Sequence, residues 1–311
     1  MANIKELAKQ PERLSSGHRL CAGCGASIVV RQVLMGTKDP IVVASATGCL
    51  EVATTIYPYT AWKTPFIHNA FENVAATISG VETAYRALKK KGKIKKDIKF
   101  VAFGGDGGTY DIGLQSLSGA LERGHNFVYV CYTNEAYMNT GIQRSGATPK
   151  GASTTTAPAG KASYGKPQLR KDLTSIVAAH RIPYVAQASA SHWNDLVTKS
   201  EKAFKVDGPA FLNVISMCHR GWRFPQEDTI KINKLAVETG YWPLIEVENG
   251  IWKFTYKPKE RKPVVEFLKT QGRFKHLFKE ENKPILAEIQ KDIDGNWARL
   301  ERMCEASCKV A

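Results

Sequence analysis

The feature that most constrains the fold is a strand–loop–helix–strand unit in which polar residues follow each strand. An apolar run at residues 98–103 leads directly into the glycine-rich segment 104–108. Leucines at helical spacing then continue as far as Gly124, a residue type that commonly ends helices. A second apolar run, residues 127–132, reads as another strand. Because two strands joined through a helix lie parallel, the sequence predicts an α/β fold with a doubly wound, mainly parallel sheet.

Two oxygen-bearing side chains follow these two strands. Asp106 comes after the first and Asn134 after the second, so both belong at the carboxyl ends of strands, where open α/β sheets bind ligands. Carboxylate and amide oxygens are ligands that Mg²⁺ accepts beside phosphates. Gly105 and Gly107 flank Asp106 and bring no Cβ between the backbone and a phosphate. Gly-Asp-Gly alone is a weak signal, but with Asn134 it is typical of the diphosphate- and magnesium-binding signature of thiamine-diphosphate enzymes.

The cysteines predict a metal centre at the same edge of the sheet. The chain has seven cysteines, and an odd number without a secretion signal argues against a disulfide framework. Cys21 and Cys24 form a Cys-x-x-Cys pair, while Cys49 and Cys218 each follow an apolar run that reads as a strand. Four such thiols suit a [4Fe–4S] cluster; a zinc site, a redox Cys-x-x-Cys and unrelated buried thiols remain alternatives. Cys131 lies inside an apolar run and is expected in the core.

The charge balance is strongly basic. Lysine and arginine exceed aspartate and glutamate by 15, with concentrations at residues 89–96 and in the stretch 136–171, which has no acidic residue. No nucleic-acid-binding motif accompanies these charges, so nucleic acid is not expected; an acidic protein partner or anionic substrate remains. No apolar run approaches the roughly 20 residues of a membrane span. The N-terminus lacks the apolar run of a signal peptide, so we expect no membrane contact and a cytoplasmic location.

Six short segments together identify a family. They are residues 21–25, 46–51, 57–60, 105–107, 134–141 and 218–222. In this order they resemble the beta subunits of 2-oxoacid:ferredoxin oxidoreductases, most closely those of the pyruvate:ferredoxin type. The resemblance runs from about Gly17 to about Glu246. It implies a sheet of the thiamine-diphosphate-binding type, with thiamine diphosphate, Mg²⁺ and a [4Fe–4S] cluster as cofactors.

The resemblance also implies a reaction. A 2-oxoacid, with pyruvate favoured, is oxidatively decarboxylated to acyl-CoA and CO₂, and electrons pass through the cluster to ferredoxin. The same machinery acting on another 2-oxoacid, or on oxalate without coenzyme A, is an alternative. A non-catalytic electron-transfer subunit and a zinc-stabilised α/β binding protein are alternatives of other classes. Retention of Asp106, Asn134 and Asn139 argues against loss of catalysis.

Individual site residues follow from the resemblance, residue by residue. Asp106 and Asn134 would bind Mg²⁺ through their side chains, and Ala136 through its backbone carbonyl. Asn139 would lie near the reacting carbon. The four cysteines that would hold the cluster are Cys21, Cys24, Cys49 and Cys218. The residues that would contact the cofactor are Thr47, Gly48, Cys49, Gly105, Asp106, Gly107, Asn134, Ala136 and Thr140.

Two departures from the family pattern stand out. His219 follows Cys218 where the family usually has proline; an imidazole there either raises the cluster potential or, as we expect, belongs to the surface. No glutamate is an evident activator of the aminopyrimidine ring, although Glu51, Glu72 and Glu82 are available. In this family another subunit supplies that glutamate, so the chain alone is expected to form an incomplete active site.

The chain divides into three parts by pattern. Residues 1–16 read as an N-terminal arm and residues 17–225 as the domain that binds thiamine diphosphate and the cluster. Residues 226–311 read as a helical extension that contacts a partner subunit. Within the domain, residues 146–168 are rich in Gly, Ala, Ser, Thr and Pro, which predicts a long loop that either covers the cofactor or lies free at the surface.

Overall fold

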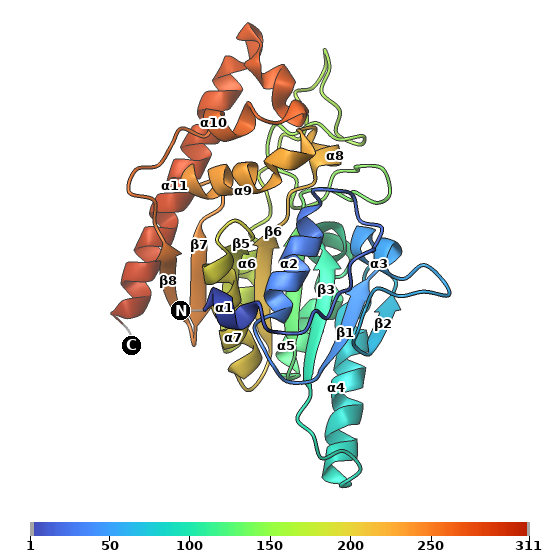
Figure 1. The fold of residues 1–311 in the computed structure, drawn as a ribbon. Helices are drawn as coiled ribbons and strands as arrows, with labels where there is room; N and C mark the ends of the chain where they lie inside the picture. The colour runs from blue at the N-terminus through green and yellow to red at the C-terminus, as the bar shows by residue number, and fades with distance from the viewer. Residues whose placement is uncertain (1–2, 310–311) are drawn as a thin grey trace.

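The computed structural model describes residues 3–309, and within them one sheet of eight strands runs through the molecule (Figure 1). The strands are β1 (Ile41–Ala46), β2 (Phe66–Asn69), β3 (Lys99–Gly105), β4 (Val128–Thr133), β5 (Tyr184–Ser189), β6 (Ala210–Ile215), β7 (Leu244–Glu248) and β8 (Ile251–Tyr256). Their order is β2-β1-β3-β4-β6-β5-β7-β8. The first six strands in that order are parallel, and β7 and β8 are antiparallel. The prediction of a mainly parallel α/β sheet is confirmed.

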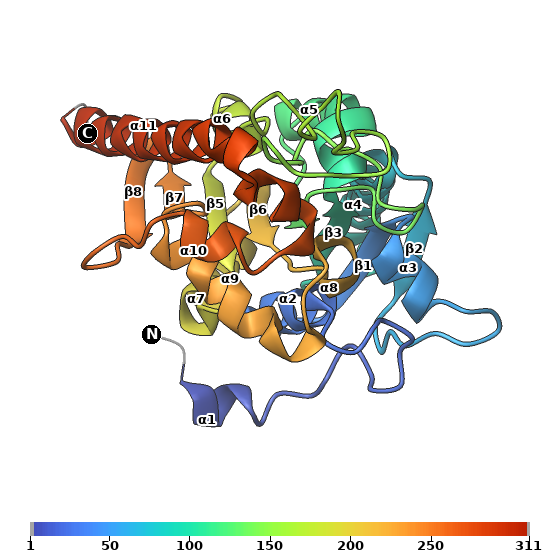
Figure 2. The same ribbon diagram turned by 90° about the horizontal axis from the view of Figure 1, so that it is seen from above.

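Helices cover both faces of the sheet, as Figure 2 shows from above. The α-helices are α1 (Ile4–Leu7), α2 (Gly25–Leu34), α3 (Cys49–Thr54), α4 (Val74–Lys90), α5 (Leu114–Glu122), α6 (Leu173–Ala178), α7 (Trp193–Lys205), α8 (His219–Trp222), α9 (Thr229–Glu238), α10 (Val265–Leu268) and α11 (Lys283–Cys308). A π-helix η1 (Gly107–Ile112) and 3₁₀-helices η2 (Gln226–Asp228), η3 (Gly272–Phe278) and η4 (Glu280–Asn282) complete the set. One core cluster joins α2 and α7 to one face, and another joins α4, α5, α6 and α11 to the other.

The central strands are buried from end to end. All six residues of β4, and all six of β5 and β6, are buried, which is the pattern of parallel strands covered on both faces. The helix after β3 ends where the sequence predicted, since Gly124 has a left-handed φ of 68° just beyond α5. The strand–helix–strand unit read from the sequence is therefore present.

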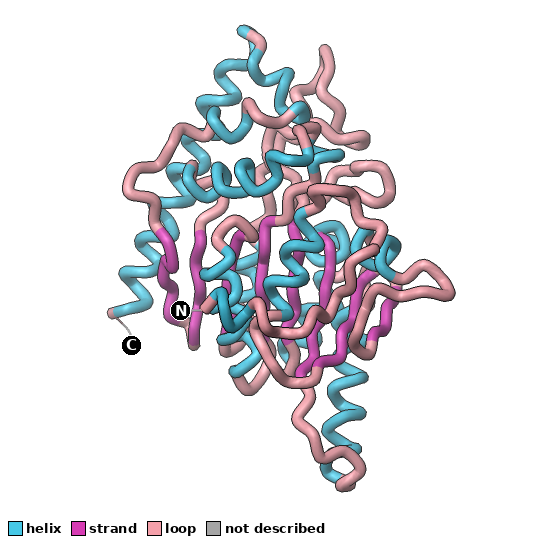
Figure 3. Tube along the Cα trace, viewed as in Figure 1, coloured by secondary structure: helices cyan, strands magenta, loops and turns pink. Residues whose placement is uncertain are grey.

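The carboxyl edge of the parallel strands carries most of the irregular structure. Between β4 and α6 the chain forms no helix or strand over residues 134–172, so the predicted long loop is confirmed. Figure 3 shows these loops gathered beyond the strand ends. A third core cluster, formed largely by α8, α9, α10, η3 and α11, lies at the same edge. The small pocket described below lies at this edge, beyond the ends of β1, β3 and β4.

The C-terminal region contributes more than helices. Strands β7 and β8 form a hairpin that extends the sheet beyond β5, and α11 lies against β8 (Figure 1). The sequence analysis expected a helical extension after residue 225 and missed this hairpin. Because β7 pairs with β5, the extension shares one sheet with the preceding residues. The N-terminal arm is also anchored, because Leu7 and Leu14 are buried against the domain. No helix within residues 3–309 is long and apolar enough to span a membrane.

Candidate functional site: an oxygen-lined turn beside a four-cysteine cavity

Asp106 occupies the end of β3 and is almost wholly buried, at 1% exposure. Its Oδ1 accepts hydrogen bonds from the backbone N–H groups of Asn134 (3.0 Å) and Glu135 (3.1 Å). Ser145 Oγ donates to Oδ2. Burial raises the pKa of Asp106 to about 7 despite these hydrogen bonds. A carboxylate buried in this way needs a counter-charge, which a divalent cation supplies.

Three oxygen-bearing groups predicted as Mg²⁺ ligands converge at this point. The Asn134 side-chain amide faces Asp106 Oδ1 and the Ala136 carbonyl oxygen, and its near atom lies 2.9 and 2.8 Å from them. With nitrogen in that place the contacts are hydrogen bonds. With oxygen there, three oxygens meet at the separation of neighbouring ligands in an octahedron, which is about 3 Å for Mg²⁺ at about 2.1 Å. The donor set therefore fits a magnesium ion.

A small pocket of about 30 Å³ brings together every predicted cofactor residue. The predicted residues that line it are Thr47, Gly48, Cys49, Gly105, Asp106, Gly107, Asn134, Ala136, Asn139 and Thr140. They come from the ends of β1, β3 and β4, three neighbouring strands. Chain order reverses between β1 and β3, which is where open α/β sheets bind ligands. The sequence analysis gave no role to Phe71, Tyr132 and Tyr137, which also line the pocket.

The glycines around Asp106 serve packing as well as access. A Cβ on Gly107 would lie 2.3 Å from the Tyr137 ring, and one on Gly108 would lie 2.8 Å from the Phe71 carbonyl oxygen. A Cβ on Gly105 would meet nothing closer than 3.5 Å. Open access to a phosphate, the reason given for both glycines from the sequence, therefore accounts for Gly105 better than for Gly107, where the Tyr137 ring excludes a side chain.

The four cysteines predicted to bind a cluster line a single cavity of about 260 Å³. Burial, with a smaller contribution from the neighbouring thiols, raises the pKa of Cys24 to about 11 and that of Cys49 to about 12. Cys218 also has a pKa raised mainly by burial. Thiols whose ionisation is disfavoured in this way suit a cationic centre, which deprotonates its ligands. No group of three His, Cys, Asp or Glu within residues 3–309 is already arranged around a single metal ion.

The two pockets adjoin each other. Cys49, Asn134 and Asn139 line both the small pocket and the cysteine cavity. Cys218 reaches the cavity from the N-cap of α8, and the last residue of that helix, Trp222, donates its Nε1–H to the Asn134 carbonyl at 2.7 Å. The cysteine cavity and the turn 134–136, the candidate metal-binding turn, are thus joined by direct contacts.

His219 also lines the cysteine cavity. It is half-buried rather than a surface residue, and its Nδ1 is buried without a hydrogen-bond partner among the described residues. The expectation of a surface histidine is therefore wrong. Cys131, by contrast, is fully buried in β4 as expected, and its Sγ contacts Thr133 Oγ1 at 3.3 Å.

The three glutamates considered from the sequence lie outside both pockets. Glu82 is buried on α4 and pairs with Arg86 and His125. Glu51 accepts a hydrogen bond from Thr55 Oγ1 at 2.8 Å. Neither these two nor Glu72 lines the small pocket or the cysteine cavity.

Comparison with known proteins matches residues 46–214, more than half of the chain, to the thiamine pyrophosphate enzyme family, C-terminal TPP binding domain. The chain is similar to pyruvate synthase subunit PorB of Thermotoga maritima, with 59% identity covering 96% of this chain and 95% of the relative. It is also similar to ketoisovalerate oxidoreductase subunit VorB of Pyrococcus furiosus, with 44% identity covering 97% of both.

The chain belongs to the family of 2-oxoacid:ferredoxin oxidoreductase beta subunits. Members of this family are oxidoreductases with a thiamine-diphosphate-binding domain, and the small pocket lies at the strand ends of that domain. A solved structure of 2-oxoglutarate:ferredoxin oxidoreductase from Magnetococcus marinus matches with a TM-score of 0.58. It covers 89% of this chain and 96% of that chain at 20% identity, so it shows the family fold.

Proposed function

We propose that this chain is the catalytic subunit that binds thiamine diphosphate, Mg²⁺ and one [4Fe–4S] cluster in a 2-oxoacid:ferredoxin oxidoreductase. The reaction is the oxidative decarboxylation of a 2-oxoacid to acyl-CoA and CO₂. Electrons leave through the cluster to ferredoxin. Family membership supports the enzyme class, and the arrangement of the two pockets supports the rest.

One observation carries the proposal: the metal-binding turn and the four-cysteine cavity share a wall. Cys49, Asn134 and Asn139 belong to both. A cofactor bound over the small pocket would therefore adjoin a cluster held by the cysteines. Such proximity suits a reaction in which electrons pass singly from the cofactor to the cluster.

The residues that line the small pocket have distinct roles in this proposal. Asp106, Asn134 and the Ala136 carbonyl would hold Mg²⁺, and Gly105 leaves room for the diphosphate beside them. Asn139 has an amide that can donate a hydrogen bond where negative charge develops near the reacting carbon. When bound, thiamine diphosphate supplies the nucleophilic carbon and the electron sink for loss of CO₂. The residues assigned to cofactor contact alone are Thr47, Gly48, Gly107 and Thr140.

Pyruvate is the favoured substrate. Seven similar relatives carry the name pyruvate synthase subunit PorB, at 48% to 59% identity, and the ketoisovalerate relative is 44% identical. Another 2-oxoacid, or oxalate without coenzyme A, is the second candidate. It stays open because the arginines that grip a substrate carboxylate would lie on another subunit.

Other subunits complete the active site in this proposal. The small pocket has a volume of about 30 Å³, room for an ion or a few water molecules, so most of the cofactor would lie outside it. None of Glu51, Glu72 and Glu82 lines it, so a partner would supply the glutamate that activates the aminopyrimidine ring. Ferredoxin and coenzyme A are the remaining partners.

The test is anaerobic viologen reduction by the native complex purified through this chain. Thiamine diphosphate and Mg²⁺ are present, and pyruvate, 2-oxoisovalerate, 2-oxoglutarate and oxalate are compared with and without coenzyme A. We expect the fastest reduction with pyruvate and dependence on coenzyme A. Faster reduction with another acid replaces the substrate, and no reduction by a complex with intact clusters and all subunits supports a non-catalytic electron-transfer subunit.

A further inference from the structure

A buried acidic residue stands between the proposed magnesium ligands and has no role so far. Glu135 lies between Asn134 and Ala136, is 0% exposed and adopts a left-handed φ of 68°. A non-glycine residue with that conformation is strained, and the conformation persists only where the surroundings hold it in place. Its backbone N–H donates to Asp106 Oδ1 at 3.1 Å, and its carbonyl accepts from Thr148 Oγ1 at 2.6 Å. The backbone on both sides of the turn is thereby fixed.

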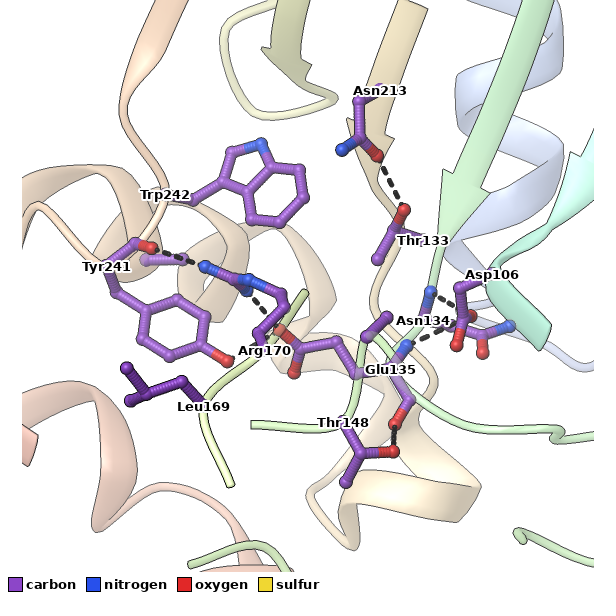
Figure 4. A network of polar contacts seen from close by, with 12 residues as sticks. Asp106, Thr133, Asn134, Glu135, Thr148, Leu169, Arg170, Asn213, Tyr241 and Trp242 are labelled. Carbon is purple, nitrogen blue, oxygen red and sulfur yellow. Dashed lines mark hydrogen bonds and ion pairs between the residues drawn. The ribbon is translucent and has the colours of Figure 1, made fainter. Parts of the chain in front are cut away.

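Three residues from distant parts of the chain donate hydrogen bonds to the Glu135 side chain, and Figure 4 shows two of them, Arg170 and Tyr241. Arg170 Nη1 donates to Oε1 at 2.8 Å, and Tyr241 OH donates to the same oxygen at 2.5 Å. Arg273 Nη2 donates to Oε2 at 2.6 Å. Arg273 is itself 2% exposed, and Tyr241 is 5% exposed. A carboxylate surrounded by such donors in a buried site has one preferred position.

The arginines are held in turn by aromatic rings. Arg170 lies over the rings of Tyr241 and Trp242, 4.8 and 4.7 Å from their centres. The Arg273 guanidinium lies 3.7 Å from the centre of the Trp222 ring. Trp222 donates to the Asn134 carbonyl, so a closed ring of contacts runs from Asn134 through Glu135, Arg273 and Trp222 back to Asn134. The two flexible-chain cations therefore have few alternative positions.

We propose that Glu135 is a positioning residue through which the C-terminal extension holds the turn 134–136 in its metal-binding conformation. The inference rests on the magnesium site proposed above. Tyr241 and Arg273 belong to the extension, and Glu135 is the point at which both reach the turn. Its carboxylate fixes the strained φ that aims the Asn134 amide and the Ala136 carbonyl at one point. The extension is thus part of the cofactor site's support as well as a helical and hairpin layer.

A matched pair of substitutions tests this role in the native complex. Glu246 is also buried, and it too accepts a tyrosine hydroxyl and two cationic donors, from Tyr184, Lys202 and Lys253. It lies on β7, away from both pockets. Glu135→Gln and Glu246→Gln should both lower the thermal midpoint. Only Glu135→Gln should weaken Mn²⁺ binding that depends on thiamine diphosphate, by about tenfold, as loss of residues supporting metal ligands commonly does.

Free Mn²⁺ measured by electron paramagnetic resonance gives the affinity without relying on turnover. Equal Mn²⁺ affinity in the two variants, with the unsubstituted complex binding normally, overturns the positioning role and leaves the proposed function intact. No thiamine-diphosphate-dependent Mn²⁺ binding by the unsubstituted complex overturns both.

A milder pair covers the case in which Glu135→Gln does not fold. Tyr241→Phe and Tyr184→Phe each remove one buried tyrosine-to-glutamate hydrogen bond. Tyr241→Phe should weaken Mn²⁺ binding severalfold, and Tyr184→Phe should leave it unchanged. The same affinity in both variants again overturns the role of Glu135.

Discussion

Asp106 lies at the centre of the proposed metal site, and burial of its carboxylate destabilises the metal-free fold when that group is charged. Burial raises its pKa to about 7, which means that the folded protein favours the neutral form more than the unfolded chain does. Stability from this group is therefore full at low pH and is lost as pH rises through about 7. A side chain that burdens the metal-free fold in this way is typical of a site built for function.

The substitution Asp106→Asn separates these two effects. The amide oxygen can still accept the hydrogen bonds of the Asn134 and Glu135 N–H groups, but the negative charge is gone. We expect metal affinity to fall by about 100-fold or more, while the metal-free variant unfolds at a temperature no lower than the natural protein near pH 8. Mn²⁺ titration and thermal unfolding in chelator measure the two quantities. Unchanged metal affinity would remove Asp106 from the ligand set.

Cys218 and Cys131 give a matched comparison for the proposed cluster. Cys131 lies within β4 and Cys218 at the N-cap of α8, and of the two only Cys218 lines the four-cysteine cavity. Cys218→Ala should lose most of the iron and acid-labile sulfide of the anaerobically purified complex. Cys131→Ala should keep both and lose about 1 kcal/mol of stability through a small core cavity. Zinc without sulfide in the unsubstituted complex, or full iron in Cys218→Ala, would contradict a cluster at this position.

Asp106, Cys49 and Cys218 could be predicted as site residues from the sequence, because each stands next to a local pattern. Asp106 follows an apolar run, and Cys49 and Cys218 follow others. Glu135 and Arg273 show why other contacts could not be predicted. The two residues are 138 positions apart in the sequence, and no local pattern indicates that they meet. Lys166 is buried and donates a hydrogen bond to the Thr148 carbonyl at 2.5 Å. It lies in a loop rich in small residues, and no local pattern there predicts its burial either.

The hairpin β7–β8 was missed although the sequence contains its signal. Asn249 and Gly250 form the turn, with left-handed φ values of 51° and 85°, and Asn-Gly between alternating apolar residues is a strong hairpin pattern. The helical periodicity of the segment that forms α11 led to the prediction of helices throughout residues 226–311. Strands β3 and β4 were recognised because their apolar runs are continuous, whereas the short edge strand β2 has only one partly buried residue, Phe66.

The hairpin also provides a pH-dependent contribution to stability. Glu246 on β7 lies opposite Lys253 on β8. Burial alone would raise the pKa of Glu246, but hydrogen bonds from Lys202, Lys253 and Tyr184 outweigh it and lower the pKa to about 2 from 4.5. A lowered carboxyl pKa stabilises the fold above the unfolded value and loses that effect as pH falls through the folded value. The contribution is roughly 3 kcal/mol at neutral pH.

Glu246→Gln measures this contribution directly. The difference in unfolding free energy between the natural chain and the variant should be largest above about pH 5 and should shrink as pH falls from 4.5 toward 2. Urea unfolding at a series of pH values gives both numbers. A difference that stays constant over that range would mean that the carboxylate charge does not stabilise the hairpin.

The excess of positive charge over the whole molecule is distributed unevenly. Several cations of the stretch 136–171 are used internally: Lys150 pairs with Glu288 and Asp292, and Lys171 pairs with Asp111. The lysines of residues 89–96 lie at the end of α4, on the side of the molecule opposite the carboxyl edge (Figure 1). The exposed Arg19 instead lines the four-cysteine cavity, and the exposed Arg220 lies two residues after Cys218, which also lines it. Net charge alone therefore does not say where an acidic electron carrier docks.

Electron transfer to ferredoxin should depend on charge near the cysteine cavity rather than on total charge. Arg220→Glu and Lys95→Glu change the net charge equally, but only Arg220 lies in α8, two residues after Cys218. If an acidic carrier approaches the cluster through this chain, Arg220→Glu should lower the second-order rate of ferredoxin reduction roughly 3- to 10-fold at low salt. Lys95→Glu should change it little, and the difference should vanish at high ionic strength because salt screens exposed charges.

Iron content and viologen reduction confirm that each variant keeps its cluster. Equal effects of the two variants would mean that the total charge attracts the carrier, and a rate independent of salt in the natural complex would mean that docking does not use this basic surface.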